Sequence, residues 1–188
     1  MNWTALVPLK PPEARKTRMA ERLSQNERVA LSERLFAHVV GVLAQHPAIE
    51  RVVVLAPEKP AAWTGVWVVD AGRGLNGELE AARRSLAPGP LLIVHADLPL
   101  LSPADLDALL AGAAAQGVAI APDRHGTGTN ALALAADRTL VFSFGADSFC
   151  RHADQAPDGA VIRRNGLALD LDTAEDFEQA IAAGFRFP

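Results

Sequence analysis

The sequence predicts a single α/β domain in which a mainly parallel β-sheet is flanked by helices. Short apolar segments alternate along the chain with longer segments whose apolar residues recur at helical spacing. That alternation is typical of a parallel sheet with helices on both faces. The short segments are continuously apolar, as expected for strands that are covered on both sides. A length of 188 residues suits one domain with one core.

The first elements carry clear local signals. The segment TALVPL, Thr4–Leu9, is expected to form a short buried strand. Ser24 and Glu27 have the spacing of a capping box, which predicts a long amphipathic helix that extends to about His46. The apolar segment RVVVLA, residues 51–56, is expected to form the next strand.

The rest of the chain continues the alternation. Ser102 and Pro103 place a cap and a proline at the start of a helix, an arrangement that helices favour. The other expected elements are strands at 65–70 and 90–97, strands near Val118 and Ala131, a strand GLALDL at 166–171, and helices at about 77–86 and 173–183.

Composition and charge exclude several classes of protein. Hydrophobic residues make up 49% of the chain and charged residues 21%, which is typical of a globular protein. The net charge of −4 gives no reason to expect a nucleic acid or an anionic membrane as partner. We expect neither a secretory leader nor a membrane span. The single cysteine, Cys150, has no partner for an internal disulfide, so a cytoplasmic location is expected.

The segment that follows the first strand is strongly basic. Lys10, Arg15, Lys16, Arg18 and Arg22 lie within thirteen residues of one another. Ligands of parallel sheets bind beyond the carboxyl ends of the strands, where such cations could hold a polyphosphate. The alternative is a solvated basic loop, and we favour phosphate binding.

Aspartates follow two of the expected strands. Asp97 ends a buried strand, where a carboxylate is costly unless it is paired, hydrogen-bonded or bound to a hard divalent cation; the alternative is that it only organises the following turn. His95 is expected to be a strand residue with a satisfied hydrogen bond. Asp172 and Glu175 have the spacing of a helix N-cap and its acidic N3 residue, which leaves Asp170 as the candidate second ligand. The reverse assignment of the two aspartates stays open.

A glycine-rich segment, DRHGTGTNALAL at residues 123–134, contains many small hydrogen-bonding residues. Glycines allow backbone N–H groups to approach an anion, and hydroxyls add donors. Together with Gly145, Ser148, Arg151 and His152 of the segment FSFGADSFCRH, it predicts a cradle for a small anionic group. The phenylalanines of that second segment are expected to pack in the core.

These motifs in this order resemble the guanylyltransferases of the deazaflavin coenzyme F-420 pathway, the 2-phospho-L-lactate guanylyltransferase family. The resemblance covers essentially the whole chain through VPLK, RKTRM, GLN, DLP, DRHGTGTN, FGADSFCRH and DLDTAEDF. It implies a nucleotide-diphospho-sugar transferase (glycosyltransferase A-like) fold, related to molybdenum-cofactor guanylyltransferases. It also implies one nucleotidyltransferase domain over residues 1–188. The alanine before Asp97 departs from the glycine that is common there, and two prolines stiffen the basic loop.

The resemblance further implies roles for individual residues. The implied Mg²⁺ ligands are Asp97 and Asp170, and the residues that act on the triphosphate are Lys10, Lys16 and Arg18. The implied acceptor-binding residues are Thr129, Gly145 and Ser148, and Asn76 is implied to contact guanine or ribose.

The implied reaction transfers GMP from GTP to a phosphorylated three-carbon carboxylate and releases pyrophosphate. Family members use 2-phospho-L-lactate, phosphoenolpyruvate or 3-phospho-D-glycerate. Arginine outnumbers lysine fifteen to three, a bacterial feature that favours the last two. Two alternatives remain at this stage, namely a nucleotidyltransferase for molybdopterin or a sugar phosphate, and a non-catalytic GTP-binding homologue. A homodimer is compatible with the sequence.

Overall fold

The computed structural model describes residues 2–11 and 16–187, and its strands form one sheet in the order β3-β2-β1-β4-β6-β5-β7. The strands are β1 (Trp3–Pro8), β2 (Ile49–Ala56), β3 (Val66–Val69), β4 (Leu91–Val94), β5 (Val118–Pro122), β6 (Thr129–Leu134) and β7 (Ala160–Val161). Parallel pairing joins β1 to β2 and β4, β2 to β3, and β5 to β7. Strand β6 is antiparallel to both of its neighbours, β4 and β5. The predicted mainly parallel sheet is confirmed.

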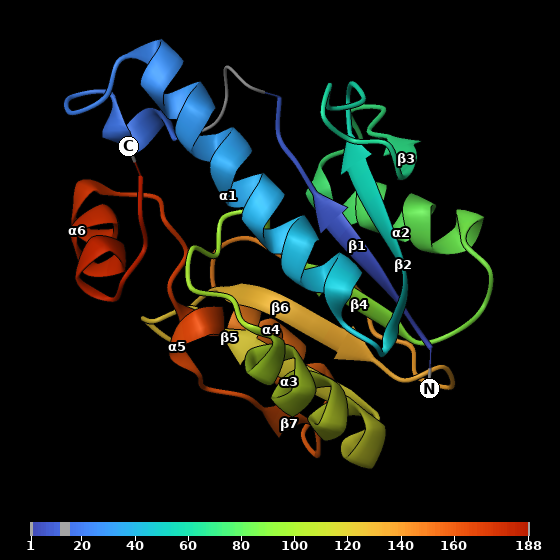
Figure 1. The fold of residues 1–188 in the computed structure, drawn as a ribbon. Helices are drawn as coiled ribbons and strands as arrows, with labels where there is room; N and C mark the ends of the chain where they lie inside the picture. Colours follow the sequence, from blue (N-terminus) through green and yellow to red (C-terminus); the bar gives the residue numbers. More distant parts are fainter. Residues whose placement is uncertain (1, 12–15, 188) are drawn as a thin grey trace.

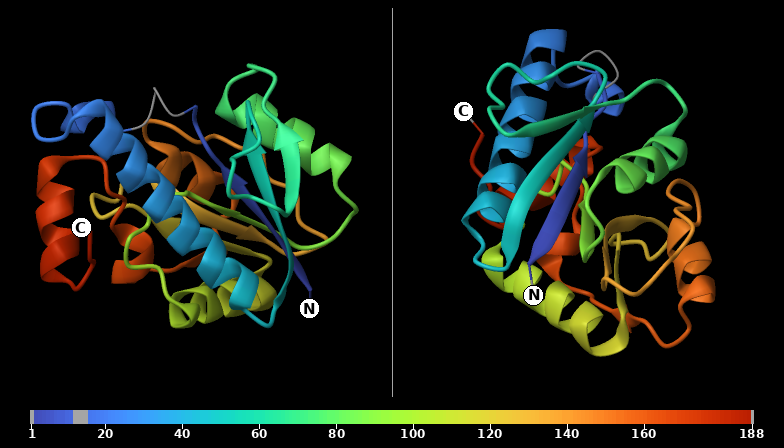
Figure 2. Two further views of the ribbon diagram at one scale, coloured as in Figure 1. Left: turned by 45° about the horizontal axis from the view of Figure 1, so that its top comes forward. Right: turned by 90° about the vertical axis from the view of Figure 1, so that its right-hand side faces the viewer.

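Helices cover both faces of this sheet. They are α1 (Gln25–Gln45), α2 (Leu75–Ser85), α3 (Pro103–Gln116), α4 (Ser148–Gln155), α5 (Asn165–Ala168) and α6 (Ala174–Ala182), with a 3₁₀ turn at Thr17–Met19. Helices α1 and α3 pack on one face and α2 and α4 on the other, as Figures 1 and 2 show. Side chains alternate accordingly along β1, where Ala5 and Val7 face α1 and Leu6 faces the opposite layer. In the part of the chain described, no helix has the length and apolar character needed to span a membrane.

Helix α1 begins where the sequence predicts. The Ser24 backbone N–H donates to Glu27 Oε2 over 2.8 Å, and the Glu27 N–H donates to Ser24 Oγ over 3.4 Å. This reciprocal capping box satisfies donors that the first helical turn leaves unpaired. The helix ends with His46 as its C-cap, so the predicted helix is confirmed at both ends.

The strand predicted at residues 166–171 is wrong. Residues Asn165–Ala168 form α5, and an extended segment follows them across the carboxyl ends of the strands. Leu167 packs in the main core, whereas Leu169 and Leu171 pack with Met19 in a separate cluster that includes α6. Burial of these leucines therefore accounts for the apolar alternation without a strand. The segment passes the end of β4, where the Leu171 N–H donates to Asp97 O. It cannot pair with β4 itself, because both edges of that strand are already paired with β1 and β6.

The strand order creates a crevice at the carboxyl edge of the sheet. From β1 the chain adds β2 and then β3 on one side, whereas β4 pairs with the other side of β1. The loops after β1 and β4 therefore leave in opposite directions, and ligands of α/β sheets bind at such a reversal. The antiparallel strand β6 begins at this same edge and brings the turn at residues 123–128 to it.

Candidate active site

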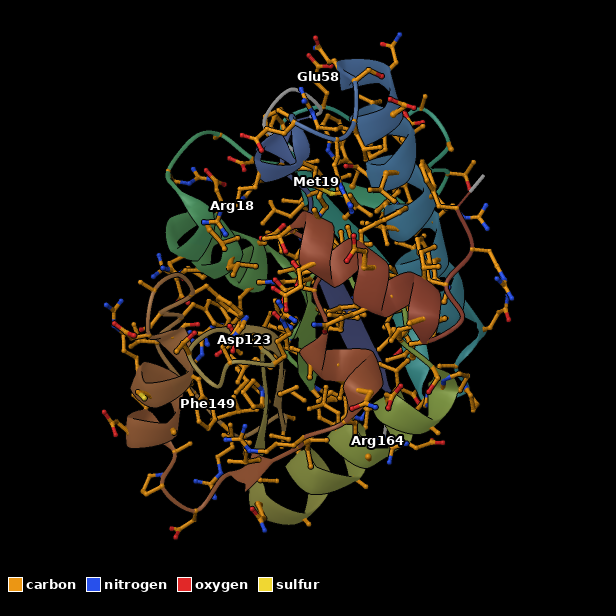
Figure 3. The ribbon with its side chains drawn as sticks, turned by 90° about the vertical axis from the view of Figure 1, so that its left-hand side faces the viewer. Arg18, Met19, Glu58, Asp123, Phe149 and Arg164 are labelled. Carbon is orange, nitrogen blue, oxygen red and sulfur yellow. The ribbon has the colours of Figure 1, made fainter. Side chains whose placement is uncertain are left out.

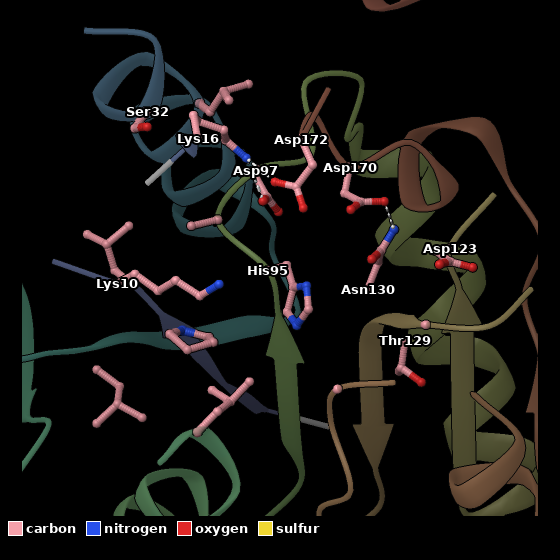
Figure 4. Close-up of a pocket in the computed structure, with 18 of the residues that line it drawn as sticks. Lys10, Lys16, Ser32, His95, Asp97, Asp123, Thr129, Asn130, Asp170 and Asp172 are labelled. Carbon is pink, nitrogen blue, oxygen red and sulfur yellow. Dashed lines mark hydrogen bonds and ion pairs between the residues drawn. The ribbon is translucent and has the colours of Figure 1, made fainter. Parts of the chain in front are cut away.

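A cleft of about 440 Å³ lies at the carboxyl edge of the sheet, within the size range of small-molecule sites. Its walls come from the ends of β1, β4 and β5 and from the starts of β6 and α4. The predicted site residues that line it are Lys10, Lys16, Asp97, Thr129, Gly145, Ser148 and Asp170. Figure 4 shows Lys10 entering the cleft from the side opposite Asp170. Residues spread over most of the chain are thus brought to one place.

Lys16 is the central cation of the cleft. Its Nζ lies 2.7 Å from Asp97 Oδ2 and 3.0 Å from Asp172 Oδ1, while its side chain is only 5% exposed (Figure 4). Burial alone would lower the pKa of the Lys16 ammonium, but the two carboxylates outweigh it and raise that pKa above its ordinary value. Its backbone has a φ of 53°, a left-handed conformation that is uncommon for a residue other than glycine.

The two predicted metal ligands differ in their surroundings. Burial opposes ionisation of Asp97, but the Lys16 ammonium outweighs it and holds the pKa of the Asp97 carboxyl below its ordinary value. Burial and then the negative charge of Asp97 raise the pKa of the Asp170 carboxyl. Asp170 Oδ1 accepts one hydrogen bond from Asn130 Nδ2 over 3.2 Å. A cation placed between the two carboxylates would relieve their repulsion.

The residues present fit a hard cation. Asp97 Oδ1 is buried and has no hydrogen-bond partner among the described residues, a costly state unless a cation or donor faces the oxygen. Within residues 2–11 and 16–187, no group of three or more His, Cys, Asp and Glu side chains is arranged to hold a metal. The protein therefore offers two carboxylates, and Mg²⁺ commonly takes its remaining ligands from water and substrate phosphates.

Asp172 does not cap the last helix, and this part of the sequence interpretation is wrong. The N-cap of α6 is Thr173, whose N–H donates to Asp176 Oδ2 over 2.6 Å, so that Asp176 rather than Glu175 is the N3 residue. The helix begins one residue later than the pattern suggested. This shift leaves the Asp172 carboxylate available to pair with Lys16.

The glycine-rich segment closes the turn between β5 and β6. Asp123 accepts hydrogen bonds from the backbone N–H of Thr127 over 2.9 Å and from its hydroxyl over 3.2 Å. A Cβ on Gly128 would lie 2.8 Å from Asp123 Oδ2, so a larger residue there would have to displace the carboxylate that holds the turn. The backbone N–H of Phe149 donates to Thr127 O over 3.0 Å and joins this turn to α4; Figure 3 shows Asp123 and Phe149 on these neighbouring segments. The small residues thus allow a tight turn at the cleft.

Four predicted residues lie differently from the expectation. Arg18 is exposed on the 3₁₀ turn and does not line the cleft (Figure 3). Asn76 uses its amide to bond the backbone of Phe144 and also lies outside the lining. Arg151 is exposed, whereas His152 is buried behind the cradle.

His95 lines the cleft just beyond β4. Its backbone N–H donates to Asn130 O over 3.0 Å, and its ring lies 5.6 Å from that of Phe144, centroid to centroid. Its ring nitrogens have no hydrogen bond to a described residue. The expected satisfied hydrogen bond is therefore made by the backbone and not by the ring.

Two buried polar residues that shape the site were missed by sequence reasoning. Asn130 Nδ2 donates to Leu167 O over 3.0 Å and to Ala168 O over 3.1 Å, which holds the segment that carries Asp170. Glu78 accepts the N–H groups of Ala71 and Arg73 over 3.0 and 2.8 Å and organises the loop after β3. Asn130 is the last residue of the GTGTN motif, so the residue itself could be singled out from sequence. Its hydrogen-bond partners could not, because they lie some forty residues away along the chain.

The fold is shared with solved structures that are described as a nucleotide-diphospho-sugar transferase and a nucleotidyl transferase. A protein from Desulfovibrio desulfuricans assigned as a nucleotide-diphospho-sugar transferase has a TM-score of 0.75 at 18% identity, over 93% of this chain and 84% of its own. A nucleotidyl transferase from Methanothermobacter thermautotrophicus has a TM-score of 0.66 at 16% identity, over 97% and 99% of the two chains. At such identities the likeness establishes the fold alone, and it is the predicted fold.

Sequence relatives define the family. The phosphoenolpyruvate guanylyltransferase of Sphaerobacter thermophilus is 37% identical over 95% of this chain and 92% of its own length. The 2-phospho-L-lactate guanylyltransferase of M. thermautotrophicus is 33% identical over 98% of this chain and 86% of its own length. Fold, cleft and relatives together define a nucleotidyltransferase. A family model described as guanylyl transferase, CofC like, matches residues 3–184, and the chain belongs to that family. The predicted resemblance is confirmed.

Proposed function

We propose that this enzyme transfers GMP from GTP to the phosphate of a small phosphorylated carboxylate and releases pyrophosphate, as a step of deazaflavin coenzyme F-420 biosynthesis. One observation carries the proposal. A buried lysine with its carboxylates and a donor-rich cradle face each other across a single cleft. The first group suits a triphosphate and the second suits a small anion.

In the proposed reaction an oxygen of the acceptor phosphate attacks the α-phosphorus of GTP. The bond between that phosphorus and the oxygen bridging to the β-phosphate breaks, and pyrophosphate leaves with the electron pair. No general base is required, because a phosphate monoester has a second pKa of about 6 and is largely a dianion at neutral pH. The task of the protein is to bring two anions together in the correct orientation.

The lysines and carboxylates would have complementary roles. Asp97 and Asp170 would hold Mg²⁺, with support from the buried, unpartnered Asp97 Oδ1. When bound, the ion would offset phosphate charge and polarise the α-phosphate. Lys10 and Lys16 would stabilise the charge that develops on the leaving pyrophosphate. Exposed Arg18 would reach the triphosphate only at the rim of the cleft.

The acceptor would lie against Thr129, Gly145 and Ser148. Gly145 has a φ of 116° and an open approach at its Cα, where a Cβ would meet nothing within 4 Å. Ser148 is the first residue of α4, and the positive end of the helix dipole favours an anion there. We favour phosphoenolpyruvate among the three candidate acceptors, because relatives such as that of S. thermophilus are named for it.

Pyrophosphate release from GTP tests this proposal. The enzyme would be incubated with GTP, Mg²⁺ and each of phosphoenolpyruvate, 3-phospho-D-glycerate and 2-phospho-L-lactate, with a reaction lacking acceptor as blank. We expect release that depends on one acceptor. We also expect Asp97→Asn to lower the rate at least about 100-fold, since that variant removes a charged ligand of the Mg²⁺ that would polarise the α-phosphate. Asp107→Asn, on an exposed aspartate of α3, is the matched control.

The outcomes separate the alternatives. GTP binding without release of pyrophosphate in the presence of any of the three acceptors would contradict the proposal and favour a different acceptor or a non-catalytic nucleotide-binding protein. Near-wild-type turnover of Asp97→Asn would contradict only the assignment of that aspartate.

A further inference from the structure

His152 is a fully buried residue of helix α4. It lies behind the acceptor cradle, by which we mean the residues Thr129, Gly145 and Ser148 that line the cleft. Its Nε2 lies 3.0 Å from the backbone nitrogen of Ser143, and its Nδ1 lies 3.0 Å from Thr129 Oγ1. One ring therefore connects the start of β6, the segment before Gly145 and the helix that begins at Ser148. These are the three places from which the acceptor-binding residues were predicted.

The hydrogen bonds fix the protonation state of this ring. A backbone N–H can only donate, so His152 Nε2 must accept and carries no proton. The ring proton is then on Nδ1, which donates to the hydroxyl oxygen of Thr129. Burial lowers the pKa of the His152 imidazole to about 4, in agreement with a neutral ring. A protonated Nε2 would face the Ser143 N–H, donor against donor.

The segment held by the ring has little support of its own. Residues 139–144 form neither helix nor strand, so their polar backbone groups need partners from side chains. Asn76 holds Phe144 from the opposite side, accepting from its N–H over 2.7 Å and donating to its carbonyl over 3.0 Å. The Phe144 ring also packs edge-on against His152, with the centroids 4.9 Å apart. The position of Gly145 thus depends on these two side chains.

We propose that His152 is a positioning residue that sets the spacing of the acceptor cradle by clamping Thr129 and Ser143 to helix α4. The inference rests on the proposed function, since the ligand of the cradle is the phosphorylated carboxylate acceptor. His152 does not itself line the cleft, so it acts through the groups it holds. Loss of the clamp should weaken binding of the acceptor and leave the nucleotide side of the cleft unchanged.

Three substitutions divide the clamp into its two arms. In His152→Asn the side-chain amide can still donate to Thr129, and in His152→Gln it can still accept from the Ser143 N–H. His152→Leu removes both bonds. We expect the KM for the acceptor to rise about tenfold in each amide variant and about 100-fold in the leucine variant, with the KM for GTP changed by less than about twofold. The matched control is His46→Gln, since that buried ring also accepts a backbone N–H, from Ala48, but lies at the amino end of β2.

A measurement on the free protein completes the test without requiring turnover. Two-dimensional ¹H–¹⁵N NMR of the imidazole should show His152 neutral at pH 7 with its proton on Nδ1. A charged ring or a proton on Nε2 would overturn the clamp. So would an unchanged acceptor KM in His152→Leu, or a parallel rise of the KM for GTP. If the wild-type enzyme released no pyrophosphate with any acceptor, the proposed function would fail, and the NMR result would still decide whether the clamp exists.

Discussion

Asn76 has one role predicted from sequence and another indicated by the structure. The resemblance implied contact with guanine or ribose, but both polar atoms of its amide bind the backbone of Phe144. We therefore predict that Asn76→Ala raises the KM for the acceptor about tenfold and changes the KM for GTP by less than about twofold. Steady-state kinetics with each substrate varied in turn would measure both values.

The matched control for this variant is Asn165→Ala, because Asn165 is exposed at the start of α5. That variant should leave both KM values unchanged. A rise confined to the KM for GTP in Asn76→Ala would instead support the nucleotide contact implied by the resemblance.

At the level of secondary structure, the start of α6 gives a second test. Asp176 is buried and accepts the N–H groups of Thr173 and Asp172 over 2.6 and 3.0 Å, and Arg124 Nη2 lies 2.8 Å from it. Glu175, the N3 residue expected from sequence, is exposed and pairs with Arg124 only at 3.4 Å. We predict that Asp176→Ala lowers the free energy of unfolding by about 2 kcal/mol. Glu175→Ala should cost less than about 0.5 kcal/mol. Urea denaturation would measure both, and equal losses would contradict the assignment of Asp176, rather than Glu175, as the N3 residue that supports the cap.

Elements with local signals could be predicted, and those that depend on distant partners could not. The capping box of Ser24 and Glu27 lies within four residues, so the start of α1 follows from sequence. The segment at residues 166–171 has the alternation of a strand, but no local feature reveals that both edges of β4 are occupied. Which strands pair depends on the whole sheet, and the periodicity of a short segment does not predict it.

The same division applies to the candidate site. Asp97 and the basic segment were predictable, because a charged residue directly after a buried strand is conspicuous in sequence. The clamp at His152 and the contacts of Asn130 were not, since their partners lie 9 to 40 residues away. Sequence thus identified most of the predicted residues that line the cleft, although Arg18 and Asn76 lie outside that lining, while the structure identified the groups that hold the lining residues in place.

At the scale of the whole molecule, the strand order divides the cleft into two sides. Lys10 and Lys16 follow β1, which leads to β2 and β3, whereas Thr129 begins β6 in the other half of the sheet. Asp97 follows the central strand β4 between these halves. The reversal of β6 is what brings an acceptor cradle to the edge where the parallel strands end. The two substrates would then approach from opposite halves and meet beyond β4.

This division predicts separate footprints in hydrogen exchange. A non-hydrolysable GTP analogue with Mg²⁺ should slow exchange in residues 16–22 and 95–98, because bound phosphates restrain the backbone that they contact. The acceptor, added to that complex, should slow exchange mainly in residues 123–129 and 143–149. Residues 135–138, at the opposite edge of the sheet, serve as the internal control. Protection of 143–149 by the nucleotide alone would place the triphosphate in the cradle and reverse the assignment of the two sides.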